Sequence, residues 1–156
     1  MEKFTFRDFT QTLKPEEIQL AEKIDNLYLL NGCRREIKTA ASGFTVSYIS
    51  EKSKKTMANF VCRKTGLKIR ITPLKPFSGD DLLAEAPENM QHDSTRGNDC
   101  KRLTGASVCN PRCAMGYTLN LNGKIYHKCR SMAFLFAVIE ENMPTIIALV
   151  QRELNI

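Results

Sequence analysis

Residues 57–72, MANFVCRKTGLKIRIT, predict two β-strands joined by a tight turn. Apolar and polar residues alternate in both halves, which is the pattern of strands with one face in the core and one face in solvent. Thr65 and Gly66 stand between the halves, and we expect them to form the turn. The two strands, Met57–Lys64 and Leu67–Thr72, are therefore expected to pair antiparallel.

The predicted pairing separates the side chains of this hairpin onto two faces of a sheet. The mainly apolar face carries Phe60, Cys62, Lys64, Leu67, Ile69 and Ile71. The opposite face carries Asn59, Val61, Arg63, Lys68 and Arg70. Neighbouring cations repel one another, so such a face favours an anion. We predict that Arg63, Lys68 and Arg70 bind an anionic partner, with nucleic acid as the commonest candidate and another polyanion as the alternative.

A solvated outer face, neutralised by acidic residues from elsewhere in the chain, is the other interpretation of these three cations. No aromatic residue alternates with the charges on this face. Stacking of bases on aromatic rings is the usual mode of binding to single strands, and the pattern does not favour it.

Two helices are expected before the first strand. Thr5 can cap a short helix over residues 5–13, and Pro15 fits the first turn of a longer helix that extends to Asn31. Gly32 is a natural stop after it. The apolar stripe of the longer helix is Leu20, Ile24, Leu27 and Tyr28. Such a stripe at helical spacing is typical of a face that packs on a core.

The segments on either side of the 57–72 hairpin predict further elements. Residues 34–43 are expected to form a polar link, and the alternation in 44–49 predicts a strand. Proline and glycine interrupt residues 73–99, which we expect to be irregular apart from a short helix at Asp80–Ala86, with a mobile polar segment at 87–99. The apolar run at 132–139 predicts a strand, chosen over a buried helix.

A closing helix at Pro144–Leu154 completes the pattern. The fold class expected from these elements is α+β. It consists of an antiparallel sheet of five or six strands, with the Pro15–Asn31 and Pro144–Leu154 helices packed on one face and a cysteine-rich hairpin as an insert. The length of 156 residues fits a single domain, 1–156, which can build a core without disulfides.

The cysteine-rich stretch is CKRLTGASVCNPRCAMGYTLNLNGKIYHKCR, residues 100–130. It contains Asn122-Gly123 between two alternating runs, which predicts a hairpin because a type I′ turn needs positive φ at both central positions. The arms are expected at Gly116–Leu121 and Lys124–Arg130. In this register Cys129 lies opposite Gly116, which has no side chain to obstruct it.

Four cysteines of this stretch predict a structural zinc site. Cys109 and Cys113 are joined by a short turn, Cys129 approaches them through the hairpin, and Cys100 is the expected fourth ligand. Four thiolates leave no open coordination position, so the zinc is expected to be structural. Reduced cysteines that line a core and a disulfide or redox role are the alternatives, and His127 is an alternative fourth ligand.

A thiol-based enzyme or redox sensor is the main alternative to a binding module. Cys129 lies between Lys128 and Arg130, and adjacent cations lower the pKa of a thiol. The Cys109/Cys113 pair is the second candidate. No Ser-His-Asp or Cys-His pattern stands out in a chain with two histidines, so we expect a protein that is not an enzyme. A third alternative is a small-molecule-binding domain with its pocket between the sheet and the irregular segment.

Charge and hydropathy bear on partners and location. The net charge of +6 raises the expectation of a polyanionic partner. No apolar run approaches the ~18 residues of a membrane span, and the charged N-terminus lacks the apolar stretch of a signal peptide. We therefore expect a cytoplasmic protein with no membrane partner, in which cysteines stay reduced.

The strand pattern GFTVSYIS…MANFVCRKTGLKIRI and the ending FLFAVIEENMPTIIALVQREL resemble those of small uncharacterised bacterial α/β proteins, and resemble the YdhG-type domain of unknown function. The cysteine-rich stretch departs from the YdhG-type pattern. The resemblance implies no activity and no catalytic residue.

Overall fold

The computed structural model describes residues 3–72, 81–106, 108–109, 111–113, 116–129 and 134–156. These residues form an α+β fold with a five-stranded antiparallel sheet in the order β1-β2-β3-β4-β7 and a separate two-stranded sheet, β5-β6. The strands are β1 (Cys33–Ala40), β2 (Gly43–Ser50), β3 (Thr56–Arg63), β4 (Gly66–Ile71), β5 (Tyr117–Leu121), β6 (Lys124–Lys128) and β7 (Leu135–Ala137). The helices are α1 (Phe6–Thr10), α2 (Pro15–Leu29), α3 (Asp81–Ala84), α4 (Glu88–Thr95), α5 (Lys101–Thr104) and α6 (Met143–Leu154), with a 3-10 turn η1 (Glu140–Asn142). The predicted fold class is confirmed.

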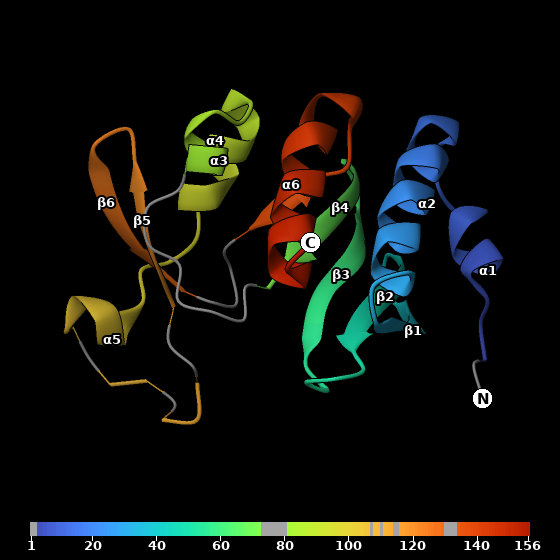
Figure 1. Ribbon diagram of the computed structural model, residues 1–156, viewed down its shortest axis with the longest axis horizontal. Coiled ribbons are helices and arrows are strands. Elements are labelled where there is room, and N and C mark those ends of the chain that lie inside the picture. The colour runs from blue at the N-terminus through green and yellow to red at the C-terminus, as the bar shows by residue number, and fades with distance from the viewer. Residues whose placement is uncertain (1–2, 73–80, 107, 110, 114–115, 130–133) are drawn as a thin grey trace.

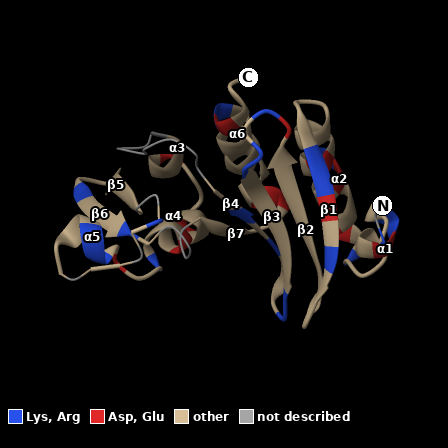
Figure 2. Cartoon of the chain, turned by 90° about the horizontal axis from the view of Figure 1, so that it is seen from below, with Lys and Arg blue, Asp and Glu red and all other residues tan. Residues whose placement is uncertain are grey.

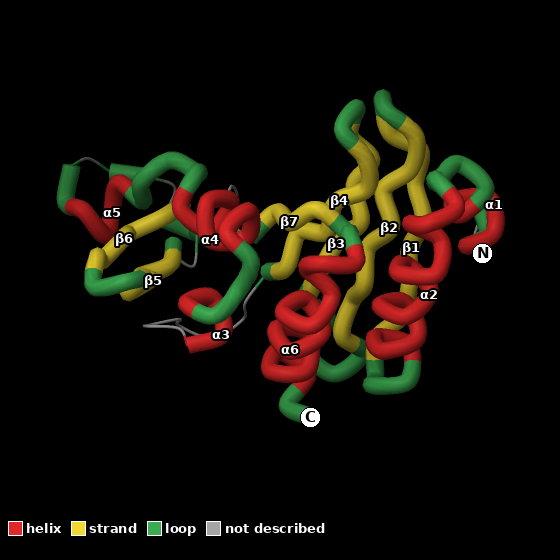
Figure 3. Tube along the Cα trace, turned by 90° about the horizontal axis from the view of Figure 1, so that it is seen from above, coloured by secondary structure: helices red, strands yellow, loops and turns green. Residues whose placement is uncertain are grey.

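The helices α2 and α6 lie side by side on one face of the five-stranded sheet, as two views of the chain show (Figures 1 and 3). The helix α4 lies beside β7 at the edge of the sheet, and the β5–β6 hairpin with α5 lies farther out beyond that edge (Figure 3). We call the face of the five-stranded sheet that is turned away from α2 and α6 the open face.

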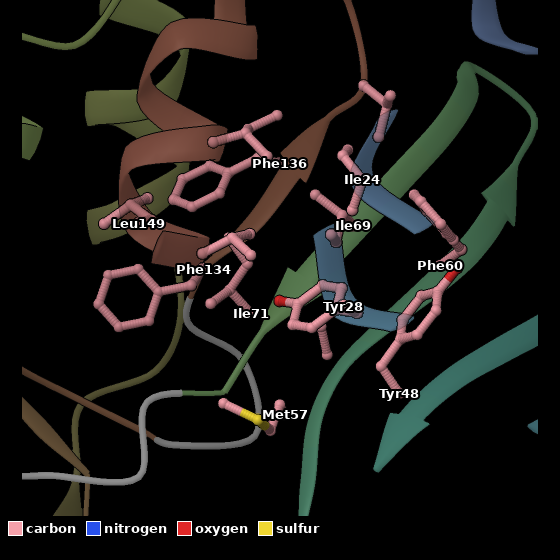
Figure 4. Packing of buried hydrophobic residues seen from close by; sticks show 14 of the residues in the cluster. Ile24, Tyr28, Tyr48, Met57, Phe60, Ile69, Ile71, Phe134, Phe136 and Leu149 are labelled. Atoms are coloured by element: carbon pink, nitrogen blue, oxygen red, sulfur yellow. The ribbon is translucent and has the colours of Figure 1, made fainter. Parts of the chain in front are cut away.

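Aromatic rings form much of the core between the sheet and the helices (Figure 4). Tyr28 of α2 stacks on Tyr48 of β2 with ring centroids 4.7 Å apart, and Tyr48 meets Phe60 of β3 edge-on at 5.7 Å. All three side chains are fully buried. The same core cluster continues to the β5–β6 hairpin, where the Tyr117 ring lies 4.9 Å from Phe134. The hairpin is thus joined to the main core by apolar contacts.

Residues 33–40 form strand β1, so the prediction of a polar link was wrong. The strand pairs with β2 over its whole length, from Cys33 opposite Ser50 to Ala40 opposite Gly43. The alternation was hidden because Arg35 occupies a position on the core side. The Asp25 carboxylate of α2 accepts two hydrogen bonds from Arg35 Nη1, at 2.7 and 2.8 Å, and neutralises its charge there.

Residues 88–95 form helix α4, where we expected an irregular segment. The sequence signal was weak because the buried side of this helix consists of Met90 and Ser94. Ser94 donates its hydroxyl hydrogen to the Met90 carbonyl oxygen and so loses no hydrogen bond by burial. The expected short helix is present as α3, and residues 73–80 lie outside the described part.

The turn between β3 and β4 consists of Lys64 and Thr65, one residue earlier than predicted. Gly66 belongs to β4 and lies opposite Arg63. The buried Glu17 carboxylate accepts a hydrogen bond from the backbone N–H of Leu67 at 2.7 Å. A Cβ atom at position 66 would lie 2.9 Å from that carboxylate, so the contact requires glycine there.

Replacement of Asp25 by alanine is expected to lower the free energy of unfolding by about 3 kcal/mol, because it leaves the Arg35 cation without its carboxylate partner. The two side chains are 6% and 20% exposed, so solvent compensates little. Chemical denaturation measures the change. The double variant Asp25→Ala with Arg35→Met is expected to recover part of the loss, and a loss below about 1 kcal/mol for Asp25→Ala would contradict a structural role for the pair.

Candidate anion-binding site

The open face carries cations on strands at both sides of a neutral strip. Its strand residues are Arg34, Glu36 and Lys38 on β1, Thr45 and Ser47 on β2, Asn59, Val61 and Arg63 on β3, Lys68 and Arg70 on β4, and Leu135 and Ala137 on β7. Five of these residues are cationic and one is acidic. The acidic residue, Glu36, pairs with Arg34 on the same strand at 2.7 Å. The alternating charges along β1 are visible in Figure 2.

The strand register places the three predicted residues on one face. Lys68 lies opposite Val61, Arg70 lies opposite Asn59, and Arg63 lies opposite Gly66, two pairs closer to the turn than Val61 and Lys68. The face assignment made from the alternation is confirmed, although Arg63 and Lys68 are diagonal neighbours rather than a directly opposed pair. Whether these residues bind an anion stays a prediction.

A hollow of about 660 Å³ lies between the β3–β4 hairpin and the C-terminal end of α4. We call it the basic hollow. It is lined by Arg63, Lys64, Thr65, Lys68, Arg70, Asp93, Arg96, Gly97 and Leu135. Five cationic side chains thus meet a single carboxylate, that of Asp93. Figure 3 shows that α4 lies beside β7. Asp93 of α4 and Arg96, which follows it, form one wall of the hollow.

Arg70 is the most constrained cation of the basic hollow. Its side chain is half-buried, and its Nε atom is buried without a hydrogen-bond partner among the described residues. Burial, and after it the charge of Arg63, lowers the pKa of Arg70 from its ordinary value. A buried donor without a partner costs free energy, and a bound anion removes that cost by accepting its hydrogen bond.

The carboxylate in the basic hollow neutralises little of its charge. The closest ion-pair distance is 4.0 Å between Asp93 Oδ1 and Arg96 Nη1, and the Arg96 side chain is 69% exposed. Such an exposed ion pair contributes little free energy, so Asp93 offsets little of the positive charge of the hollow. Across the described residues, Lys38, Arg63, Lys68 and Arg70 form no ion pair with a carboxylate.

Sequence reasoning missed two cations of the basic hollow. Lys64 was expected on the apolar face, but the earlier turn takes it out of the strand and into the lining. Arg96 directly follows α4, and it reaches the hollow because that helix lies beside β7. The four-residue spacing of Met90 and Ser94 was the available signal for α4.

The β5–β6 hairpin has the predicted register. Leu119 lies opposite Tyr126, and Thr118 lies opposite His127, with Thr118 Oγ1 and His127 Nδ1 3.0 Å apart. Asn122 and Gly123 both have positive φ, at 53° and 84°, as a type I′ turn requires. The hairpin prediction is confirmed over the paired residues.

Residues 98–100 add a further pairing to β6 that the sequence did not predict. The Cys100 N–H donates to the His127 carbonyl oxygen at 2.8 Å, and the Cys129 N–H donates to the Asn98 carbonyl oxygen at 2.7 Å. Asp99 lies opposite Lys128 between these bonds. Cys100 therefore lies opposite His127 on the backbone register.

The Cys100 sulfur lies in a group of backbone donors. Burial raises the pKa of this thiol, but hydrogen bonds from the backbone N–H groups of Leu103, Gly116 and Arg102, together with the Arg102 charge, outweigh burial, and the pKa is lowered. The side chain is 8% exposed, so access to the sulfur is narrow. The lowered pKa favours the thiolate, whereas the burial of the side chain restricts the access that a reactive thiol needs.

The four predicted zinc ligands differ in their surroundings. Cys100 is buried, Cys113 and Cys129 are half-buried, and Cys109 is exposed, and none of them is in a disulfide. Over the described ranges, no group of three or more Cys, His, Asp or Glu side chains is arranged to hold a metal ion. The zinc site of Cys100, Cys109, Cys113 and Cys129 stays a prediction from the sequence.

No family model, curated protein or solved structure matches this chain. The resemblance to the YdhG-type domain therefore stays a prediction. Among the described residues, no helix is long and apolar enough to cross a membrane.

Gly116→Ala is expected to destabilise the hairpin by about 2 kcal/mol. A Cβ atom at this position would lie 1.9 Å from the Lys128 carbonyl oxygen and 2.9 Å from Cys100 Cβ, so the two segments must move apart. Thermal or chemical denaturation measures the effect. Gly123→Asn is the control, because asparagine tolerates its positive φ and nothing lies within 4 Å of its Cβ. Equal effects of the two substitutions would contradict the close packing at Gly116.

Proposed function

We propose that this chain is a non-enzymatic, cytoplasmic binding module whose open face docks double-stranded nucleic acid through its phosphates. The observation that carries the proposal is a set of cations on one sheet face, Lys38, Arg63, Lys68 and Arg70, that have no carboxylate partner among the residues the structure describes. A folded chain that leaves neighbouring cations unneutralised pays a repulsive cost, which phosphates remove.

The spacing of the cations supports a duplex as the partner. The row on β1 and the row on β4 are separated by three strand spacings, which amounts to about 14 Å. This is close to the ~12 Å width of the major groove, so the two rows can reach phosphates on either side of a groove. The neutral strip between them contains Ser47 and Asn59, which hydrogen-bond to each other at 2.7 Å.

The absence of aromatic residues supports contact with the backbone rather than with bases. None of the described strand residues on the open face is aromatic, since Phe44, Tyr48 and Phe60 all face the helices. Contacts to phosphate position a protein without reading the sequence. We therefore expect affinity to vary little among duplexes of different sequence.

Binding to a short duplex is expected to weaken steeply with salt, and Lys68→Gln is expected to reduce the slope of log K against log salt by about one, as the loss of one phosphate contact requires. Fluorescence anisotropy over a salt series measures this. Lys23→Gln is the matched control, because it removes the same charge from an exposed position on α2, behind the sheet. Absent binding, or an equal effect of the two variants, would overturn the proposal.

The structural zinc site is a separate proposal about the cysteine-rich region. Its support is the surroundings of Cys100, where the nearby backbone N–H groups of Leu103, Gly116 and Arg102 and the Arg102 charge lower the pKa of the thiol and so favour the thiolate, the form that binds zinc. Elemental analysis of the purified protein is expected to find about one zinc per chain, with loss of the metal in Cys113→Ser. Cys62→Ser, on the sheet, is the control. Protein without zinc would remove the proposal and leave reduced cysteines.

A further inference from the structure

The basic hollow differs from the rest of the open face in its charge density and its shape. Elsewhere on the face the described strands carry two cations, Arg34 and Lys38 on β1, and Arg34 pairs with Glu36, whereas five cationic side chains line this one hollow. A phosphodiester carries one negative charge. The hollow therefore holds more positive charge than one phosphodiester group can neutralise.

A phosphomonoester is a better match for this charge. Near neutral pH it carries about −1.5 to −2 charges and has three terminal oxygens that accept hydrogen bonds. Arg70 supplies a buried Nε–H without a partner among the described residues, and Lys68, two residues before it on β4, and Arg63 line the same hollow. Guanidinium groups bind phosphate oxygens with two parallel hydrogen bonds, which favours Arg70 as the anchor.

The position of the hollow also favours a chain end. The helix α4 stands at the edge of the sheet beside β7 and contributes Asp93 and Arg96 to the wall of the hollow. A duplex that extends across the open face from β1 to β4 would meet this wall next to β7. The wall would stop the duplex from extending farther across the sheet. The phosphate that reaches the hollow is then one at the end of a strand.

We propose that the basic hollow is a specific site for a phosphomonoester, the terminal phosphate of a nucleic acid strand. This inference rests on the proposed function, and it adds that the module distinguishes phosphorylated ends from hydroxyl ends. Arg70 is the specificity-determining residue, with Arg63, Lys68 and Arg96 around the phosphate.

The test compares binding of one duplex with a 5′-phosphate, a 3′-phosphate or hydroxyl ends. One of the phosphorylated forms is expected to bind about tenfold more tightly than the hydroxyl form, the effect of one strong charge-assisted contact. Arg70→Gln is expected to abolish this preference, whereas Lys38→Gln, at the far side of the face, weakens all three duplexes alike. Because Arg70 is a half-buried cation that no described carboxylate pairs with, Arg70→Gln is expected to fold, and its melting temperature checks this.

The preference is also expected to follow the second ionisation of the phosphate. It increases between about pH 5 and pH 7, as the monoester gains its second charge. The ionisable side chains that face the bound group are Arg63, Lys64, Lys68 and Arg70 from the hairpin and Asp93 and Arg96 from α4. None of these lining residues is a histidine, so a change in the binding preference between about pH 5 and pH 7 reflects the second ionisation of the phosphate. A preference that is constant over this range would overturn the inference.

The outcomes separate this inference from the proposed function. Equal binding of all three duplexes overturns the phosphomonoester site and leaves the duplex-binding face in place. If no duplex binds, the proposed function is wrong, and the melting temperature in inorganic phosphate then tests whether the hollow binds a phosphate group at all. A rise in melting temperature with phosphate that Arg70→Gln removes supports the site by itself, and no rise overturns it.

Discussion

The carboxylate of Glu17 fixes the geometry on which the candidate site depends. One oxygen accepts a hydrogen bond from the Lys14 N–H at 3.0 Å, and the other accepts one from the Leu67 N–H at 2.7 Å. The first bond belongs to the start of α2, and the second belongs to the start of β4. A single buried side chain thus ties a helix on one side of the sheet to the register of the hairpin. Because Gly66 must lie inside β4 to allow this approach, the turn is formed by Lys64 and Thr65.

Arg35 and Arg70, the two arginines of the sheet with buried Nε atoms, have different charged neighbours on the two faces of the sheet. Arg35 and Arg70 are both half-buried, and in both the Nε atom lacks a partner among the described residues. On the helix side, Arg35 Nη1 donates hydrogen bonds to both carboxylate oxygens of Asp25, and the guanidinium lies 4.6 Å from the Phe6 ring centre. On the open face, Arg70 has Arg63 as its charged neighbour instead. Asp25 thus neutralises Arg35 on the core side, whereas no carboxylate among the described residues pairs with Arg70 on the open face.

Local patterns in the sequence were sufficient to predict the hairpins and their faces. The Asn122-Gly123 signal depends on short-range backbone geometry, and the register of β5 and β6 follows from it. The alternation in 57–72 gave the faces of β3 and β4, but their register differs by two residues from the predicted one because the turn consists of Lys64 and Thr65. Strand β1 was missed because Arg35 breaks the apolar alternation, and its partner Asp25 lies on a different element. Contacts of this kind, between residues distant in sequence, are not visible in a local pattern.

The same limit explains why the basic hollow could be predicted only in part. Arg63, Lys68 and Arg70 share a face by alternation alone, so the sequence identified them. Arg96 joins them because α4 packs beside β7, a long-range arrangement that depends on the burial of Met90. The pairing of residues 98–100 with β6 is of the same kind, and no turn signal marks it.

The cysteine-rich hairpin and the basic hollow are physically connected. Tyr117 of β5 packs against Phe134 with ring centroids 4.9 Å apart, and Phe134 precedes β7 directly. On β7, Leu135 lies opposite Arg70 and also lines the basic hollow. The short strand β7 is therefore held between the hairpin on one side and β4 on the other. Lys128 Nζ of β6 also donates a hydrogen bond to the carbonyl oxygen of Gly97, which lines the hollow, so the cysteine-rich region supports the wall of the site through both contacts.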